Sequence, residues 1–195
     1  MPEFECIVVP SSVDAEVSFQ QKGALFVERT IGVSIRLDKV DATALGRFMR
    51  LEMEETESAK EDILRIAVES FTYDRRFNLT PECNPEHRRQ ILAKWIEALG
   101  PTLIAKFKGV VVGFLNLRRV DEMTYEVFLA AVDEKYRLTG AAMGLYAKAV
   151  LMAKECNARL LIGRISSRNT AVMNIYANFG AQFSEPEDVF LMEKE

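Results

Sequence analysis

A strand that runs through a short polar turn directly into a helix constrains this chain more than any other feature. Glu126–Val132 is rich in β-branched, aromatic and small apolar residues, which predicts a largely buried strand, while Met143, Tyr146 and Val150 recur at helical spacing. Between the two segments, Gly140 and the alanines after it let the backbone approach a ligand closely. Because a helix start has unpaired N–H groups and a positive dipole end, we expect an anion such as a phosphate to bind there.

Length and composition exclude several classes of protein. The 195 residues, 49% hydrophobic and 28% charged, can bury one sizeable core. A formal net charge of −4 argues against nucleic acid as the main partner. Three scattered cysteines and a single histidine, His87, favour neither a disulfide framework nor a metal site. With the apolar run Leu103–Leu117 broken by two lysines and no signal segment at the N-terminus, we expect a cytoplasmic protein that does not span a membrane.

The first part of the chain carries no catalytic motif. It contains a short apolar strand at Cys6–Val9, a helix over residues 12–21 and a strand over residues 24–37. We therefore predict an N-terminal extension or partial subdomain over residues 1–45, followed by a main domain over residues 46–195.

The main domain is expected to begin with a strand and two helices. Phe48–Met53 alternates apolar and charged side chains, as a strand does, and Ser58-Ala-Lys-Glu61 has the pattern of a capping box that opens a helix to about Ser70. A second helix is predicted to begin after Asn84 and to present its apolar residues on one side as far as Leu99.

Three antiparallel strands are predicted before the phosphate loop, since a Lys108-Gly109 turn separates two apolar runs ahead of the strand at Glu126. After the helix at residues 141–156 we expect a strand over residues 159–165. A helix follows, with Asn169 as its N-cap and Gly180 at its C-terminus. Two short strands, residues 182–183 and 189–193, are expected to complete the sheet.

Two spaced motifs resemble those of the GNAT acetyltransferases. Arg137-x-x-Gly140-x-Ala142 is similar to the acyl-CoA-binding motif, and Asn169, Tyr176 and Gly180 match the second signature. The departures are Leu138, Ala142, Val172 and Ala181, each in a position where the family commonly has another residue. The resemblance covers residues 48–195 and implies an α/β (α+β) fold. This is a mixed, mostly antiparallel central sheet with splayed fourth and fifth strands, flanked by helices.

The resemblance also implies an activity and the residues that carry it. Acetyl-CoA would serve as co-substrate without any metal, and an amine would attack the thioester directly, without an acyl-enzyme. Glu126 matches the general base of the histone-type members and Tyr176 the general acid. Both have a structural alternative, because Glu126 can be a solvent-side strand residue and Tyr176 a packed helix aromatic. The acetyl-CoA site would be formed by Ala131, Val132, Asp133, Arg137, Leu138, Thr139, Gly140, Ala141, Ala142 and Asn169.

The acceptor is predicted from a shorter match. The loop at Tyr73-Asp-Arg75-Arg76-Phe77 resembles that of dTDP-fucosamine acetyltransferases, which acetylate a 4-amino sugar on a nucleotide carrier, and Arg75 or Arg76 can pair with a diphosphate. A solvated charged loop with Phe77 in the core is the alternative. A protein N-terminus, a polyamine or another small amine stays open as acceptor, as does a non-catalytic acyl-CoA-binding module. A homodimer is one of the assemblies left open.

Overall fold

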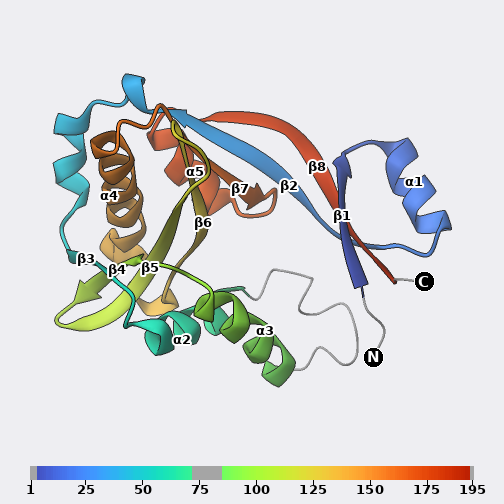
Figure 1. The fold of residues 1–195 in the computed structure, drawn as a ribbon, viewed down its shortest axis with the longest axis horizontal. Coiled ribbons are helices and arrows are strands. Elements are labelled where there is room, and N and C mark those ends of the chain that lie inside the picture. Colours follow the sequence, from blue (N-terminus) through green and yellow to red (C-terminus); the bar gives the residue numbers. More distant parts are fainter. Residues whose placement is uncertain (1–3, 72–84, 194–195) are drawn as a thin grey trace.

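The computed structural model of the protein describes residues 4–71 and 85–193, which form one sheet with helices on both faces (Figure 1). The sheet has eight strands in the order β1-β8-β2-β7-β6-β5-β4-β3, and its pairs are antiparallel except for β6 with β7. The strands are β1 Phe4–Pro10, β2 Leu25–Arg36, β3 Glu52–Thr56, β4 Thr102–Phe107, β5 Val110–Arg119, β6 Thr124–Val132, β7 Leu160–Ser166 and β8 Gln182–Glu193. This confirms the mixed, mostly antiparallel sheet expected from the sequence.

The helices divide the core in two. The larger core lies between the sheet and helices α4 and α5, and includes Leu145, Val150 and Leu161. The smaller core lies under α2 and α3 on the opposite face, and includes Ile66 and Leu92. In chain order the α-helices are α1 Val13–Gln21, α2 Lys60–Ser70, α3 Pro85–Glu97, α4 Ala141–Glu155 and α5 Thr170–Asn178, and the 3₁₀ helices are η1 Leu37–Lys39, η2 Ala42–Phe48 and η5 Glu134–Thr139. Within the described ranges, no helix has the length and apolar character needed to cross a membrane.

Predictions that depended on local turn and cap chemistry are confirmed. The hairpin between β4 and β5 turns at Lys108 and Gly109, whose φ angles are 52° and 80°, as a tight two-residue turn requires. The side chain of Asn169 accepts a hydrogen bond from the Val172 N–H at 3.2 Å and so caps α5, and Gly180 follows the helix in the left-handed region with a φ of 71°.

The strand expected at Phe48–Met53 is misplaced, because the observed strand β3 shares only Glu52 and Met53 with it. Residues up to Phe48 belong to η2, and the strand begins only at Glu52. The physical reason is visible in the packing, since the neighbouring residues Phe48 and Met49 both contact the larger core. Successive residues of a strand point to opposite faces, so an extended segment could not place both side chains there.

Two further details differ from the expectations. The capping box at Ser58–Glu61 does not form, because α2 begins after Ala59 without a side-chain cap and the Ser58 hydroxyl is hydrogen-bonded with that of Thr56. The two short strands at the C-terminus are one continuous strand, β8. It runs through Pro186 because the register between β2 and β8 shifts between Ile31 and Val33, opposite that part of β8.

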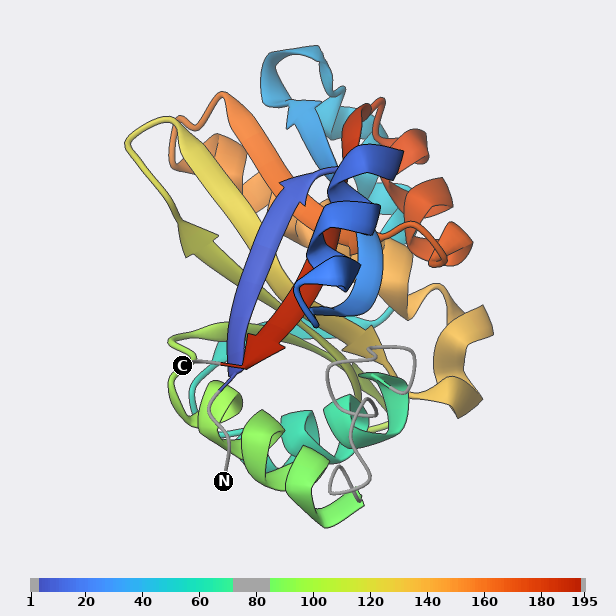
Figure 2. The same cartoon turned by 90° about the vertical axis from the view of Figure 1, so that its right-hand side faces the viewer.

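β2 is an interior strand of the sheet although it comes from the first part of the chain. It pairs with β7 on one side and with β8 on the other. Beyond β7 the ends of β2 and β8 continue with β1 as an arm that extends from the rest of the sheet, and α1 packs on the arm (Figures 1 and 2). The stacked rings of Phe19 and Phe190, with centroids 5.0 Å apart, join α1 to β8. The division at residue 45 stays a prediction, but the two parts share this sheet.

Candidate active site

The site is organised by the place where the two parallel strands part. β6 and β7 pair from Thr124 with Leu160 to Val127 with Gly163. Beyond that pair, β6 runs on to Val132 alongside β5, while β7 runs on alongside β2. The described part of the sheet therefore opens between its two central parallel strands, as the resemblance implies for its fourth and fifth strands.

A β-bulge in β6 lies at the start of this opening. Asn116 pairs with Leu129 and the next residue of β5, Leu117, pairs with Val127, so Phe128 is the extra residue. Val127 packs in the core under α4, whereas Leu129 packs against the core under α2. The bulge thus reverses which residues face each side, a role that bulges often have beside active sites.

Glu126 lies immediately before this bulge, on the face of the sheet opposite Val127. Its Oε2 accepts a hydrogen bond from Nε of Arg118 on β5 at 2.6 Å, and its side chain is 19% exposed. The guanidinium of Arg118 also lies over the ring of Phe128, 4.1 Å from the ring centre. The carboxylate is therefore held by an arginine that is itself fixed by an aromatic ring.

Tyr176 approaches the same place from the other face. It lies on α5 and is 1% exposed, with its ring edge-to-face against that of Tyr146 on α4 at a centroid distance of 5.1 Å. Burial raises the pKa of Tyr176 above its usual value of 10, and Tyr146 and Glu126 raise it further. Burial also raises the pKa of Tyr146 to about 12, against the opposing effect of its hydrogen bond with Tyr176. The Tyr176 hydroxyl is thus a hydrogen-bond donor that stays protonated at neutral pH.

The predicted phosphate loop has the geometry of an open helix start. η5 ends at Thr139, Gly140 adopts φ 83° and ψ 5°, and α4 begins at Ala141 without a side-chain cap. The first hydrogen bond of the helix runs from the Gly144 N–H to the Gly140 carbonyl at 3.0 Å. The N–H groups of the residues between them have no acceptor one turn earlier in the helix, so they are available to an anion.

Asp133 fixes the start of this loop. Its carboxylate accepts the Lys135 N–H at 3.0 Å with one oxygen and the guanidinium of Arg65 at 3.0 Å with the other. Arg65 lies on α2 and also donates to the Val111 carbonyl at 3.0 Å. Burial by itself raises the pKa of the Asp133 carboxyl, but the Lys135 N–H and Arg65 outweigh it and hold this pKa below its usual range. Asp133 therefore shapes the loop through its side chain.

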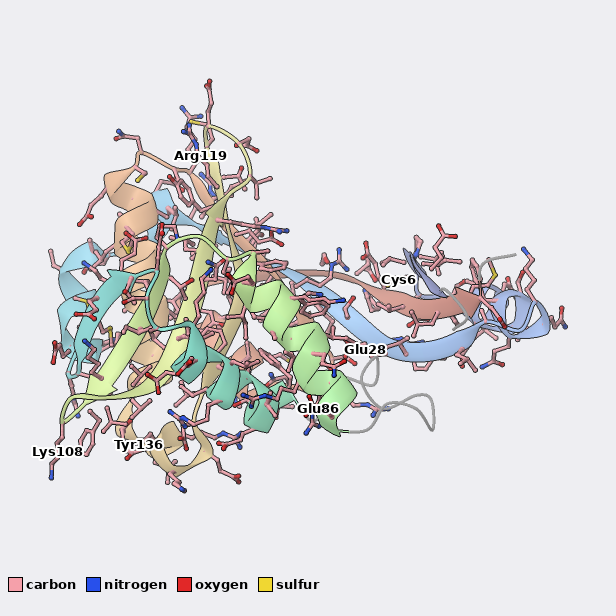
Figure 3. The ribbon with its side chains drawn as sticks, turned by 60° about the horizontal axis from the view of Figure 1, so that its bottom comes forward. Cys6, Glu28, Glu86, Lys108, Arg119 and Tyr136 are labelled. Carbon is pink, nitrogen blue, oxygen red and sulfur yellow. The ribbon has the colours of Figure 1, made fainter. Side chains whose placement is uncertain are left out.

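The remaining predicted residues of the acetyl-CoA site lie around this loop. Arg137 is exposed, and its Nη1 lies 3.9 Å from Oε1 of Glu134. The side chain of Leu138 is fully exposed. The Thr139 hydroxyl donates to the Tyr136 carbonyl at 2.6 Å, which closes η5. Figure 3 shows Tyr136 beside the turn that carries Lys108, and the Tyr136 ring packs against that of Phe107. Ala131 and Val132 end β6 next to the opening.

The predicted acceptor residues Arg75, Arg76 and Phe77 lie outside the described residues. Two arginines that sequence reasoning missed, Arg65 and Arg118, are revealed by the fold. Neither stands in a motif, and Arg65 is 68 positions from its partner Asp133. The predicted antiparallel strands on either side of the turn were a signal for the pair of Arg118 with Glu126, whereas sequence alone offered none for the pair of Arg65 with Asp133.

The matched family model is that of the acetyltransferase (GNAT) family, over residues 61–181. The chain belongs to this family of acetyltransferases. No match to a curated protein sequence was found.

Solved structures share the fold at low sequence identity. A conserved protein of unknown function from Staphylococcus epidermidis has a TM-score of 0.65 at 14% identity, over 98% of this chain and 73% of that one. A GCN5-related N-acetyltransferase from Sphaerobacter thermophilus has a TM-score of 0.63 at 16% identity, over 98% of this chain and 60% of that one. A fungal glucosamine N-acetyltransferase region within a multi-domain β-N-acetylglucosaminidase has a TM-score of 0.62 at 13% identity, over 96% and 25%. The chain thus spans three fifths of the second protein and a quarter of the third.

Proposed function

We propose that the protein transfers the acetyl group of acetyl-CoA to a primary amine by direct attack of the amine on the thioester. The observation that carries this proposal is the position of two groups beside the point where β6 and β7 part. Glu126 directly precedes Val127, which forms the last pair between the two strands, and the Tyr176 hydroxyl lies against Gly163, the partner of Val127. A substrate between the strands would have an acceptor of protons on one side and a hydrogen-bond donor on the other.

The loop at the start of α4 fits the pyrophosphate of acetyl-CoA. Gly140 has no side chain and a left-handed backbone, and no atom lies within 4 Å of where a Cβ would project, so a ligand can come close. The uncapped N–H groups that follow offer hydrogen bonds and the positive end of the helix dipole. The exposed side chains of Lys135 and Arg137 add positive charge on the same loop.

Two proton transfers accompany the proposed reaction. As the amine nitrogen bonds to the acetyl carbonyl carbon, the carbon–sulfur bond breaks and the nitrogen loses a proton to Glu126. The departing sulfur takes up one proton from solvent and Glu126 returns its proton to solvent, so acetyl amide and free thiol are the balanced products. Because the pKa of Tyr176 is raised, its role is to donate a hydrogen bond to the sulfur as negative charge develops there. Arg118 positions Glu126.

For the acceptor we propose a nucleotide-linked amino sugar. The support is the resemblance of the loop at Arg75, Arg76 and Phe77 to that of dTDP-fucosamine acetyltransferases. The fungal region that shares the fold is by its name a glucosamine N-acetyltransferase. Peptide N-termini, polyamines and other small amines are the competing acceptors.

Calorimetric titration with acetyl-CoA tests the donor site. Gly140→Glu places a carboxylate beside the proposed pyrophosphate position and should abolish measurable binding, because like charges repel and the close approach is lost. Gly140→Ala is the matched control, since it adds the same strain at φ 83° without charge or bulk. Gly140→Ala should bind distinctly better than Gly140→Glu. Equal, wild-type affinity in both folded variants would remove the loop from the site.

A panel of amines tests the acceptor. It should contain dTDP- and UDP-linked 4-amino sugars, free glucosamine, spermidine and short peptides with free N-termini, each assayed by thiol release from acetyl-CoA. The Arg75→Ala, Arg76→Ala double variant is then compared with wild type on the best substrate. A nucleotide-linked sugar should give the highest kcat/KM and should lose it in the variant. A polyamine or peptide as best substrate contradicts the acceptor proposal alone, and acetyl-CoA binding without turnover on any amine supports a binding module.

A further inference from the structure

Gly163 lies directly against the hydroxyl of Tyr176. A Cβ atom placed on Gly163 would be 2.4 Å from Oη of Tyr176, 3.3 Å from its Cζ and 3.4 Å from Cγ2 of Val33. Real Cβ atoms essentially never come within 3.0 Å of a heavy atom outside their own residue and its two chain neighbours. The phenol can therefore reach this part of the sheet only because residue 163 lacks a side chain.

The position of Gly163 in β7 makes this contact specific. It is paired with Val127 in the last pair before the two strands part. Its neighbours on the same face, Leu161 and Ile165, both fill the larger core with their side chains. A glycine inside a strand weakens the strand and often marks a close approach. Here the space that a side chain would fill is occupied by the Tyr176 hydroxyl.

We propose that Gly163 is a positioning residue, which sets the Tyr176 hydroxyl at the opening between β6 and β7 so that it can donate to the leaving sulfur. The inference rests on the proposed function of Tyr176. It adds that the place of the hydroxyl is determined by the sheet as well as by α5. The Tyr146 ring on α4 and the Val33 side chain on β2 close two other sides of the same space.

The size of the effect follows from the distances. To reach ordinary contact at 3.4 Å from a methyl group at residue 163, the hydroxyl must withdraw by about 1 Å from its present 2.4 Å. Because Tyr176 is 1% exposed, the ring and α5 would have to move with the hydroxyl. A misplacement of about 1 Å can cost about 10²-fold in rate. We expect Gly163→Ala to lower kcat by about 10- to 100-fold.

A double-mutant cycle tests the proposal, with kcat, the KM for acetyl-CoA and the free energy of unfolding measured for Gly163→Ala, Tyr176→Phe and the combined variant. Both single variants should lower kcat to a similar extent and leave the KM for acetyl-CoA within about twofold. In the Tyr176→Phe background, Gly163→Ala should change kcat by less than about twofold, since the hydroxyl is already gone. The combined variant should also be more stable than Gly163→Ala alone, because removing Oη makes room for the methyl group.

Gly32→Ala is the matched control. Its Cβ would be 2.7 Å from the hydroxyl of the exposed Ser184, which can move aside more easily than the buried Tyr176 ring, and it touches neither Tyr176 nor the phosphate loop, so it tests the addition of a methyl group to a strand glycine elsewhere in the sheet. Its effect on stability should add to that of Tyr176→Phe, and its kcat should stay near wild type. A loss of kcat in Gly32→Ala as large as in Gly163→Ala would show that crowding in the sheet is sufficient, and would overturn the proposal.

Other outcomes distinguish a failure of the role proposed for Gly163 from a failure of the role proposed for Tyr176. If Tyr176→Phe loses activity while Gly163→Ala keeps it, or if the two losses multiply, Gly163 has no positioning role and the role of Tyr176 stands. Wild-type kcat in Tyr176→Phe overturns both assignments without touching acetyl transfer itself. If Gly163→Ala does not fold, a combined variant that folds and matches Tyr176→Phe supports the contact, and one that also fails to fold contradicts it.

Discussion

The hydrogen bonds of Arg65 tie α2 to the phosphate loop, and their removal should reduce both stability and donor binding. Arg65→Met keeps the length and apolar stem of the side chain but removes its bonds to the Asp133 carboxylate and the Val111 carbonyl. The Asp133 side chain is 9% exposed, so it would lose a charged partner in a largely dry site. Both bonds involve the charged guanidinium, and a hydrogen bond to a charged group contributes about 1.5–3 kcal/mol.

The expected loss is smaller than the sum for two such bonds, because the Arg65 side chain is 39% exposed and solvent screens it. We expect Arg65→Met to lower the free energy of unfolding by about 2 kcal/mol at pH 7. Since the lost contacts hold the start of the phosphate loop, the KM for acetyl-CoA should rise several-fold while kcat changes less.

The pH dependence has a definite sign. The pKa of Asp133 is lowered in the folded protein, so its contribution to stability is present above the unfolded pKa of about 3.9 and is lost as the pH falls through the folded value. Without Arg65, the pKa of Asp133 is lowered by less. The stability gap between wild type and Arg65→Met should therefore be constant from pH 7 to about pH 5 and should narrow below about pH 4.

Denaturant unfolding at pH 7, 5 and 3.5 measures this gap. Arg36→Met is the control, because Arg36 forms a 2.8 Å pair with Asp38 in which the side chains are 52% and 56% exposed. Solvent screens such an exposed pair, so its removal should change the free energy of unfolding little. If Arg65→Met is no more destabilising than Arg36→Met at pH 7, or if its gap widens in acid, the reasoning about Asp133 is refuted.

Three further predictions concern the proposed catalysts and a helix cap. Because the pKa of Tyr176 is raised above 10, the kcat of wild type should not fall at alkaline pH through ionisation of this group, and an alkaline limb that disappears in Tyr176→Phe would contradict the raised pKa. Glu126→Gln should lower kcat with little change in the KM for acetyl-CoA, and Arg118→Gln should lower it less, since Arg118 acts through Glu126; a larger loss in Arg118→Gln would point to a direct role of the arginine. Asn169→Ala should cost about 1 kcal/mol of unfolding free energy, and an unchanged KM for acetyl-CoA would restrict Asn169 to capping α5.

The features that sequence analysis predicted correctly are those set by neighbouring residues. The Lys108-Gly109 turn and the ends of α5 at Asn169 and Gly180 depend on backbone preferences within a few positions. The strand at Phe48–Met53 failed because alternation over six residues cannot distinguish an extended segment from a short irregular one packed on a core.

The parts of the site that could not be predicted depend on long-range pairing. Arg65 meets Asp133 only because α2 packs across β5. Gly163 did carry a signal, since a glycine in the middle of a predicted strand suggests that something lies close to it, but its partner Tyr176 becomes evident only when α5 is placed on the sheet.

The interior place of β2 has a consequence for how the molecule is made. Leu25–Arg36 leaves the ribosome well before both strands that flank it, β7 and β8. The hydrogen bonds of β2 must wait for those two strands, so the sheet can close only after β8 has been synthesised. Until then β2 exposes two unpaired edges of the kind that promote aggregation. Synthesis of progressively longer stalled chains should therefore show protection of β2 from protease only when β8 has emerged.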